Sequence, residues 1–313
     1  MTEDMDRLVA VVGPTGTGKS RLSIRLAQVF NGEIVNADSR QVYRHMDIGT
    51  AKPSPQELAL VPHHLYSIVD PDEDFSLGQY QKLAFEAIWD IIKRNKLPVL
   101  AGGTGQYVWA VLDGWEVPEV PPDLQFRQSL ETRTPDELYE LLLQVDPESA
   151  QRIDRRNIRR MVRAIEVHRQ TQIPFSSLQR KKSPPFNSLI IGLTASRTEL
   201  YRRVDKRVDH MMEQGFVAEV ESLQARRYDL SLPSMYSVGY RQIGRHLKGE
   251  LTIEEAVKQI KTETHRIIRH QYAWFRLSDK RIHWFDVEKE IEPEVIDLVS
   301  RFLKGEPVDS ERS

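Results

Sequence analysis

The 313-residue chain contains no cysteine, which excludes a disulfide framework, a thiol nucleophile and a cysteine-based zinc site. It also lacks any run of about 18 apolar residues that could span a bilayer. No N-terminal apolar run resembles a signal peptide. From these absences we expect a cytoplasmic protein without a membrane partner. Hydrophobic residues make up 40 % of the chain, enough for one large domain or two smaller ones.

Net charge is also nearly absent, at −2, but the charges are unevenly distributed. Between residues 151 and 186, ten Lys and Arg residues stand against two acidic residues. An acidic stretch at 286–297 balances part of this excess. A strongly basic block in a nearly neutral protein favours nucleic acid as a partner.

A glycine-rich motif lies near the N-terminus, between an apolar run at 8–12 and a helix-patterned segment at 21–30. Its residues are Gly13, Pro14, Thr15, Gly16, Thr17, Gly18, Lys19 and Ser20, which match G-x-x-x-x-G-K-[ST]. The glycines let the backbone wrap around an anion, and the helix N-terminus directs N–H groups at it. Lys19 adds positive charge, and the Ser20 hydroxyl can hold Mg²⁺. The motif therefore predicts binding of a di- or triphosphate.

Strand and helix patterns alternate around this motif. We expect strands at 8–12, 33–37, 97–101, 188–193 and 281–285, and helices at 21–30, 77–93, 197–214, 216–226, 253–275 and 292–303. This order predicts an α/β fold with a P-loop parallel sheet and flanking helices. The loops at 13–20, 38–43 and 102–105 should meet at the carboxyl edge of that sheet.

Proline-rich segments at 115–122 and 183–185 interrupt the alternation. Between them we find helix patterns and no convincing strand. We therefore expect a core domain at 1–114 and 187–313, and an all-helical insertion domain at 115–186, with the prolines as hinges.

Asp38 follows the second predicted strand, which places a carboxylate beside the P-loop. It could hold Mg²⁺ through water or act as a general base, although an N-cap or turn role is the alternative. Ser39, Arg40 and Gln41 add donors suited to a base edge or a phosphate. Thr104 follows the third strand among glycines, where it could face the pocket or cap a helix.

Three segments carry basic side chains. Arg203 and Arg207 share one helix face and could clamp a diphosphate, or could simply be solvated. We predict five arginines on one helix of the insertion: Arg155, Arg156, Arg159, Arg160 and Arg163. Their positive charges repel one another, and contacts with nucleic-acid phosphates would offset that repulsion. The stretch 266–276 mixes basic and aromatic residues, of which we expect Trp274 and Phe275 to be core.

Together these residues resemble the bacterial tRNA dimethylallyltransferases (tRNA isopentenyltransferases) over nearly the whole chain. The motifs that carry the resemblance are Gly13–Ser20, Asn36-Ala-Asp-Ser-Arg-Gln-Val-Tyr43, Asp47-Ile-Gly-Thr-Ala-Lys-Pro53, Gly102-Gly-Thr-Gly105, Arg160-x-x-Arg-Ala-Ile-Glu166, Arg203-x-x-x-Arg207 and Ser237-Val-Gly-Tyr-Arg241. The P-loop is generic, whereas the Asp-Ser-Arg-Gln and Asp-Ile-Gly-Thr-Ala-Lys-Pro runs are far more specific.

The resemblance implies transfer of a dimethylallyl group from dimethylallyl diphosphate to N6 of the adenosine 3′-adjacent to the anticodon of a tRNA. It implies that the P-loop and Mg²⁺ hold a departing diphosphate, that Asp38 is the general base, and that Thr104, Arg203 and Arg207 contact the diphosphate. It further implies contacts between the tRNA anticodon stem-loop and two groups of residues. These are the binding-loop residues Asp38, Ser39, Arg40, Gln41 and Thr104, and the insertion residues Arg127, Arg159, Arg160, Met161, Val162 and Arg163. We expect a monomer.

One segment departs from the family pattern. The family usually reads close to Thr-Arg-x-x-Ala-Lys-Arg-Gln-x-x-Trp, whereas this chain reads Thr264-His-Arg-Ile-Ile-Arg-His-Gln-Tyr-Ala-Trp274. Histidines replace two arginines, so the resemblance assigns no role to His265 or His270.

Two other functions fit part of the sequence. A P-loop kinase of a small metabolite or nucleoside, with ATP as donor, accounts for Lys19, Ser20 and Asp38 but leaves the basic insertion unexplained. A nucleotide-switched RNA-binding protein without chemistry accounts for the P-loop and the basic block.

Overall fold

The computed structural model describes residues 6–118, 120–178 and 185–308. The chain divides into two compact units, Met1–Leu112 with Pro185–Ser313, and Asp113–Pro184. The expected domain boundaries lie two residues further along the chain at both junctions. Most of the second predicted hinge, at 183–185, lies outside the described residues.

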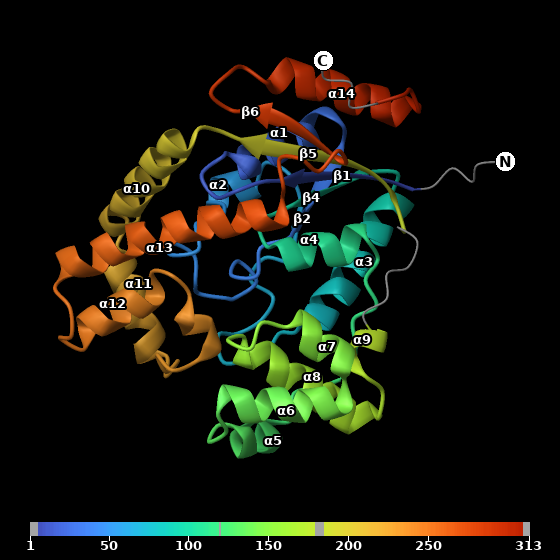
Figure 1. Cartoon of the computed structure of the whole chain (residues 1–313). Coiled ribbons are helices and arrows are strands. Elements are labelled where there is room, and N and C mark those ends of the chain that lie inside the picture. Colours follow the sequence, from blue (N-terminus) through green and yellow to red (C-terminus); the bar gives the residue numbers. More distant parts are fainter. Residues whose placement is uncertain (1–5, 119, 179–184, 309–313) are drawn as a thin grey trace. The chain divides into compact units, whose positions relative to one another are not determined.

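A six-stranded, all-parallel sheet forms the centre of the first unit, in the order β3-β2-β4-β1-β5-β6 (Figure 1). The strands are β1 (Arg7–Val12), β2 (Gly32–Asn36), β3 (His63–His64), β4 (Leu97–Ala101), β5 (Asn187–Thr194) and β6 (Ile282–Asp286). The predicted P-loop α/β fold is confirmed. The sequence pattern missed β3, because two half-buried histidines give no apolar run.

Side chains alternate between the two faces of the sheet. On one face, Val9 and Val11 pack in a core cluster with residues of α1 (Lys19–Val29) and α14 (Glu292–Lys304). Figure 1 shows α3 (Leu77–Lys93) and α4 (Gly105–Leu112) on the other side of the sheet from α14. The rings of Tyr80 and Tyr107 stack 3.6 Å apart and join α3 to α4.

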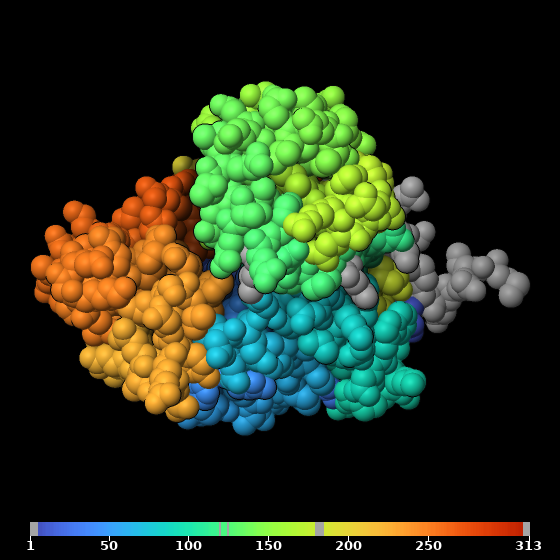
Figure 2. Space-filling model, turned by 90° about the horizontal axis from the view of Figure 1, so that it is seen from below, coloured from blue at the N-terminus to red at the C-terminus, as the bar shows by residue number. Residues whose placement is uncertain are grey.

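The remaining helices of this unit lie beyond the carboxyl edge of the sheet (Figure 1). Apart from the short helix α2 (Pro55–Leu58), which lies close to His63 of β3, they are α10 (Arg197–Glu213), α11 (Phe216–Ala225), the 3₁₀ turn η1 (Pro233–Tyr236), α12 (Tyr240–Leu247) and α13 (Ile253–Trp274). Leu200 and Val204 of α10 pack on Ile268 of α13. In Figure 2 the gold and orange residues of this region adjoin the blue residues of the N-terminal half. A hydrogen bond of 2.7 Å from Ser234 Oγ to the carbonyl of Pro71 is one link between them.

The named secondary-structure elements of the second unit, within its described residues, are all helices. Its helices are α5 (Leu124–Leu130), α6 (Pro135–Val145), α7 (Pro147–Arg152), α8 (Ile158–Thr171) and α9 (Phe175–Leu178). Leu138, Leu142 and Met161 belong to its own hydrophobic core. The expectation that five arginines share one helix is wrong, because Asn157 caps α8 and leaves Arg155 and Arg156 in the preceding turn. Within the described ranges, no helix combines the length and apolar character needed to cross a membrane.

Candidate active site

The P-loop is tightly curled between β1 and α1. Gly13, Gly16 and Gly18 have φ angles of 134°, 88° and 83°, which side chains rarely tolerate. A Cβ at Gly13 would also lie 2.3 Å from the carbonyl oxygen of Leu193. Thr17 Oγ1 and Lys19 Nζ both donate to the carbonyl of Pro14, at 2.8 and 2.9 Å. These bonds close the loop on itself and fix its backbone amides.

Two cations face this loop. Burial lowers the pKa of Lys19 to about 8, against the opposing effect of the Asp38 charge, and the charge of Arg207 lowers it further. Burial likewise lowers the pKa of Arg207, and Asp38 partly offsets this. Arg207 Nη2 donates to Thr15 Oγ1 at 2.7 Å, whereas its buried Nε has no hydrogen-bond partner among the described residues. Two partly desolvated cations beside the N–H groups of the P-loop make a built site for a polyanion.

The loop after β2 brings Asp38 to the same edge. Asn36 Oδ1 accepts the amide of Asp38, and Asp38 Oδ1 accepts the amide of Arg40, both at 2.9 Å. The turn geometry that we considered as an alternative is therefore present, but it occupies only one carboxylate oxygen. Thr104 Oγ1 accepts the Ser39 amide at 3.0 Å, so the loops after β2 and β4 meet as expected.

A pocket of about 580 Å³ connects these loops with the helices beyond the sheet. All of its residues belong to the first unit. Its polar walls come from the loops and include Thr15, Asp38, Ser39, Thr104, Arg207 and Gln271. Its apolar walls come mainly from α10, α11 and α13 and include Val208, Met211, Phe216, Ile260, Ile267 and Trp274. The pocket therefore suits an amphipathic ligand with an anionic head and an apolar body.

Gln271 is a residue whose role the sequence did not reveal. Its Oε1 accepts the amide of Thr15 at 2.8 Å, and its Nε2 donates to the carbonyl of Gly103 at 3.0 Å. A Cβ at Gly103 would lie 2.4 Å from that nitrogen, so a larger residue there would displace the Gln271 amide. One side chain of α13 thus ties the P-loop to the loop after β4.

The expectation that both Trp274 and Phe275 are core is half right. Phe275 is fully buried, but Trp274 remains 40 % exposed and lines the pocket. Its ring packs so closely on Gly105 that a Cβ there would lie 2.2 Å away. Trp274 therefore offers an aromatic face at the pocket rather than in the core.

Two other predicted site residues make bonds within the protein. Arg203 Nε donates to Glu199 Oε1 at 2.6 Å, and hydrogen bonds from Arg202 and Arg203 lower the pKa of Glu199 to about 2. Gln41 Nε2 donates to the carbonyls of Thr50 and Ala51, at 3.1 and 3.0 Å. The assignments of Arg203 to diphosphate and of Gln41 to tRNA stay predictions.

The predicted tRNA residues of the helical unit divide by exposure. Arg159 and Arg160 are exposed. Arg127 makes two hydrogen bonds to Glu166, at 2.8 and 2.9 Å, and Arg163 bonds the same carboxylate at 2.6 Å. Glu166 is fully buried, so this acid orients both arginines.

Met161 and Val162 pack with the core of the helical unit instead of lying on its surface. Met161 is fully buried and Val162 is half-buried against the same cluster. In the described structure their side chains stabilise the helical unit, and the exposed arginines beside them carry the positive charge.

The two histidines that depart from the family pattern lie in different places. His265 stacks on Tyr201 with ring centroids 3.8 Å apart, and its Nε2 lies 2.8 Å from Asp205 Oδ1. His270 is exposed and lines the pocket.

The donors at the P-loop fit a magnesium ion held mostly by phosphate. Ser20 lies exposed in the first turn of α1, and Asp38 lines the pocket near Lys19. Across the described part of the chain, no group of three or more His, Cys, Asp or Glu side chains could hold a metal by itself. Mg²⁺ commonly binds through one or two protein oxygens together with substrate phosphates and water. The residues present are therefore compatible with that mode.

A glycine-rich cradle after β1, at the carboxyl edge of an all-parallel sheet, defines a P-loop α/β protein. The family model described as IPP transferase matches residues 41–278, and the model described as isopentenyl transferase matches residues 6–66. The chain belongs to the IPP transferase family.

Named relatives and solved structures agree with this family. The chain is 48 % identical over 300 residues to a tRNA dimethylallyltransferase of Dehalococcoides mccartyi, covering 95 % of this chain and 92 % of that one. It is 51 % identical to one from Roseiflexus castenholzii, over 86 % of this chain and 89 % of that one. The crystal structure of a tRNA isopentenylpyrophosphate transferase from Bacillus halodurans matches with a TM-score of 0.71 at 36 % identity, covering 96 % of each chain.

A eukaryotic dimethylallyltransferase described as acting on tRNA is also similar in structure. It matches with a TM-score of 0.86 at 27 % identity, covering 98 % of this chain and 82 % of that one.

Proposed function

We propose that this chain is a tRNA dimethylallyltransferase. It transfers the dimethylallyl group of dimethylallyl diphosphate to N6 of the adenosine 3′-adjacent to the anticodon and releases diphosphate. One observation carries the proposal: a single pocket is lined by Thr15 of the P-loop, Arg207, Asp38 and an extended apolar wall. The names of its relatives support this reaction over a kinase.

The cradle would bind the diphosphate as a leaving group. In the reaction the C–O bond to the allylic carbon breaks, and its electron pair stays on the diphosphate oxygen. Lys19 and Arg207 would stabilise that growing negative charge with their positive charges. Such electrostatic stabilisation of the transition state is efficient in a desolvated site. Mg²⁺, held by Ser20 and the diphosphate, would supply further charge. Thr104 and Arg203 are proposed as additional diphosphate contacts.

Asp38 would act as the general base. The N6 amine of adenine is a weak nucleophile because its lone pair is delocalised into the ring. As the C–N6 bond forms, the nitrogen must lose a proton, which the second Asp38 oxygen can accept. A positioned base of this kind contributes roughly 10²–10⁴ to rate.

The apolar walls would hold the dimethylallyl group. Val208, Met211 and Phe216 line the pocket from α10 and α11. They would exclude water from an allylic centre with cationic character, which water would otherwise capture. ATP as a donor would make no use of such a wall.

The exposed arginines would bind the tRNA backbone. Arg159 and Arg160 present two positive charges from α8 to solvent. The target adenosine must leave its stack to reach Asp38, at a cost of a few kcal/mol that phosphate contacts offset. Ser39, Arg40 and Gln41 would contact the nucleotides around it, and Arg127 and Arg163 complete the proposed tRNA-binding segment, which Met161 and Val162 support from the core of the helical unit.

An assay with labelled donors separates this reaction from its competitors. We would incubate the full chain with Mg²⁺, unmodified tRNA and labelled dimethylallyl diphosphate, and in parallel with γ-labelled ATP. Label entering tRNA, with equimolar diphosphate released and no ATP turnover, supports prenyl transfer. Phosphate release from ATP without prenyl incorporation would favour a kinase, and tRNA binding without either reaction would favour a nucleotide-switched binding protein.

A further inference from the structure

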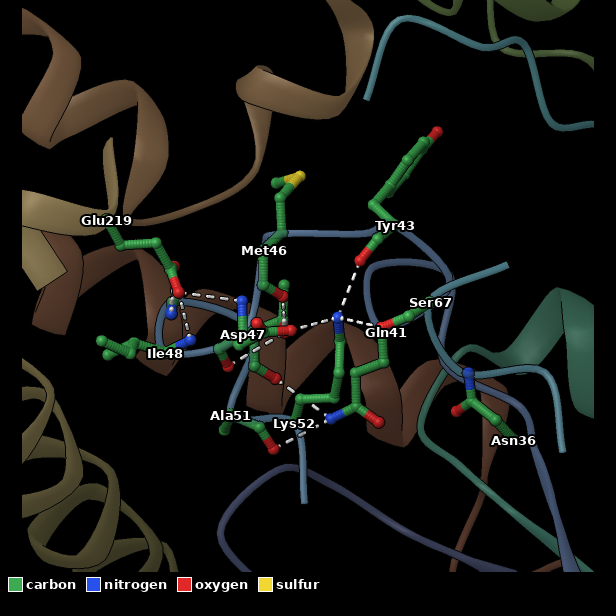
Figure 3. Close-up of polar contacts among 12 residues, drawn as sticks. Asn36, Gln41, Tyr43, Met46, Asp47, Ile48, Ala51, Lys52, Ser67 and Glu219 are labelled. Atoms are coloured by element: carbon green, nitrogen blue, oxygen red, sulfur yellow. Dashed lines mark hydrogen bonds and ion pairs between the residues drawn. The ribbon is translucent and has the colours of Figure 1, made fainter. Parts of the chain in front are cut away.

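Two charged residues outside the pocket, Lys52 and Glu219, hold the segments that form one of its walls (Figure 3). We propose that they are positioning residues for prenyl transfer. They fix the turn at 47–52 and, through it, the loop that carries Asp38. This inference rests on the proposed function, because it gives Asp38 the role of base.

Glu219 binds the turn through three consecutive backbone amides. Its Oε2 accepts the amides of Asp47 and Ile48, at 2.9 and 2.7 Å, and its Oε1 accepts that of Gly49 at 3.1 Å. Oε1 also accepts the hydroxyl of Tyr240 at 2.6 Å. Successive N–H groups that converge on one anion form a nest, and a carboxylate is the side chain that satisfies it.

These hydrogen bonds hold the turn in close contact with the ring of Phe216, which lines the pocket. A Cβ at Gly49 would lie 2.3 Å from the ring of Phe216 and 2.6 Å from the ring of Tyr240. Gly49, Thr50 and Phe216 all line the pocket. Glu219 therefore determines where the backbone of the turn lies relative to the ligand.

Lys52 ties the same turn to the segment that follows Asp38. Its Nζ donates to the carbonyl of Tyr43 at 2.7 Å, to Ser67 Oγ at 2.8 Å and to Asp47 Oδ1 at 2.5 Å. Only 4 % of its side chain is exposed, and all three ammonium protons have acceptors.

Gln41 completes the connection between the turn and the loop of Asp38. Its amide nitrogen bonds the carbonyls of Thr50 and Ala51, and it lies one residue beyond the Asp38–Arg40 turn. The downstream end of the catalytic loop is thus fixed to a turn that Glu219 and Lys52 hold. Displacement of that turn would misplace the Asp38 carboxylate without altering the P-loop.

The experiment compares Glu219→Gln with Glu221→Gln, an exposed position on the same helix. An amide presents one acceptor and one donor end, so it cannot satisfy the nest. For Glu219→Gln we expect kcat for prenyl transfer to fall about tenfold to a hundredfold, as small misplacements of reacting groups do. The affinity for inorganic pyrophosphate should stay within about twofold of wild type, because the P-loop is separate. Glu221→Gln should match wild type in both.

Hydrogen exchange on the full chain gives a readout that does not depend on the reaction. The amides of residues 47–49 should exchange faster in Glu219→Gln and not in Glu221→Gln. Ser67→Ala is a milder second variant that removes one acceptor of Lys52 and should lower kcat about threefold, with pyrophosphate binding again unchanged.

Three outcomes would overturn the inference. They are a kcat equal to that of Glu221→Gln, parallel losses of kcat and pyrophosphate affinity, or unchanged exchange at 47–49. A wild-type chain that exchanges as expected but transfers no prenyl group would instead refute the proposed function.

Discussion

The pH dependence of diphosphate binding should report the protonation of Lys19. Burial lowers the pKa of this ammonium from 10.5 to about 8, despite the opposing charge of Asp38, and Arg207 contributes to the lowering. Only the protonated form adds positive charge to the cradle. Affinity for a diphosphate should therefore fall as pH rises through about 8.

The size of this effect follows from linkage between protonation and binding. If the protonated form binds, the apparent Kd increases by the factor 1 + 10^(pH − pKa), which is roughly 1.1 at pH 7 and about 11 at pH 9. The factor by which Lys19 increases the affinity for diphosphate should thus decrease about tenfold over those two pH units. An ordinary lysine would show almost no change in this range.

Isothermal titration calorimetry with inorganic pyrophosphate, in the presence of Mg²⁺, measures the dissociation constant on which this factor depends. Lys19→Met is the matched control, because it carries no charge at any pH while pyrophosphate itself titrates equally in both experiments. The ratio of the two dissociation constants isolates the contribution of the Lys19 side chain to the affinity. A ratio that stays constant between pH 7 and pH 9 would refute the view that burial sets the charge of Lys19.

Three further perturbations test other parts of the site. Asp38→Ala should lower kcat for prenyl transfer at least about a hundredfold, as expected for loss of a general base, with tRNA affinity in a gel-shift assay within about twofold. Arg160→Ala should weaken tRNA binding with little change in kcat at saturation, and should reduce the slope of log K against log salt by about one, which a salt titration measures. Glu166→Gln should lower the free energy of unfolding by about 2 kcal/mol, measured by urea denaturation, because Arg127 and Arg163 lose a charged hydrogen-bond partner but stay partly exposed to water. Equal losses of turnover and affinity in Asp38→Ala and Arg160→Ala would contradict the separate roles, and an unchanged urea midpoint would contradict the structural role of Glu166.

The same carboxylate gives a stability dependence on pH with a definite sign. Burial alone would raise the pKa of Glu166, but hydrogen bonds from Arg127, Arg163 and the Asp123 amide outweigh it and lower the pKa. A group whose pKa is lower in the folded state contributes its stability above its unfolded pKa. That contribution should disappear as pH falls through the lowered value in the folded chain.

Local patterns in the sequence were sufficient for every strand of the sheet except β3, and for the meeting of its loops. Each buried strand is a short apolar run followed by a polar or glycine-rich turn, and carboxyl ends of parallel strands share one edge. The P-loop, Asp38 and Thr104 were predictable on this basis. The strand β3 was not, because a two-residue strand of histidines has no period to detect.

Residues that act through distant backbone were not predictable. Gln271 contacts Thr15 and Gly103, and Glu219 contacts the amides of Asp47–Gly49, more than a hundred residues away in each case. No local sequence motif indicates contacts between residues so far apart in the chain. Trp274 was misassigned because an aromatic residue at a helix end has the same local pattern whether it faces core or pocket. In the basic block, no role was predicted for Glu166, although it orients two of the arginines.

The most direct test of the central claim is mass spectrometry of tRNA fragments after incubation with dimethylallyl diphosphate and Mg²⁺. We predict one dimethylallyl group on N6 of the adenosine 3′-adjacent to the anticodon, released diphosphate in equal amount, and loss of the product with Asp38→Ala. A modification at another nucleotide, or unmodified tRNA under conditions where the chain binds both substrates, would contradict a pocket in which the P-loop holds the leaving group while Asp38 takes the proton.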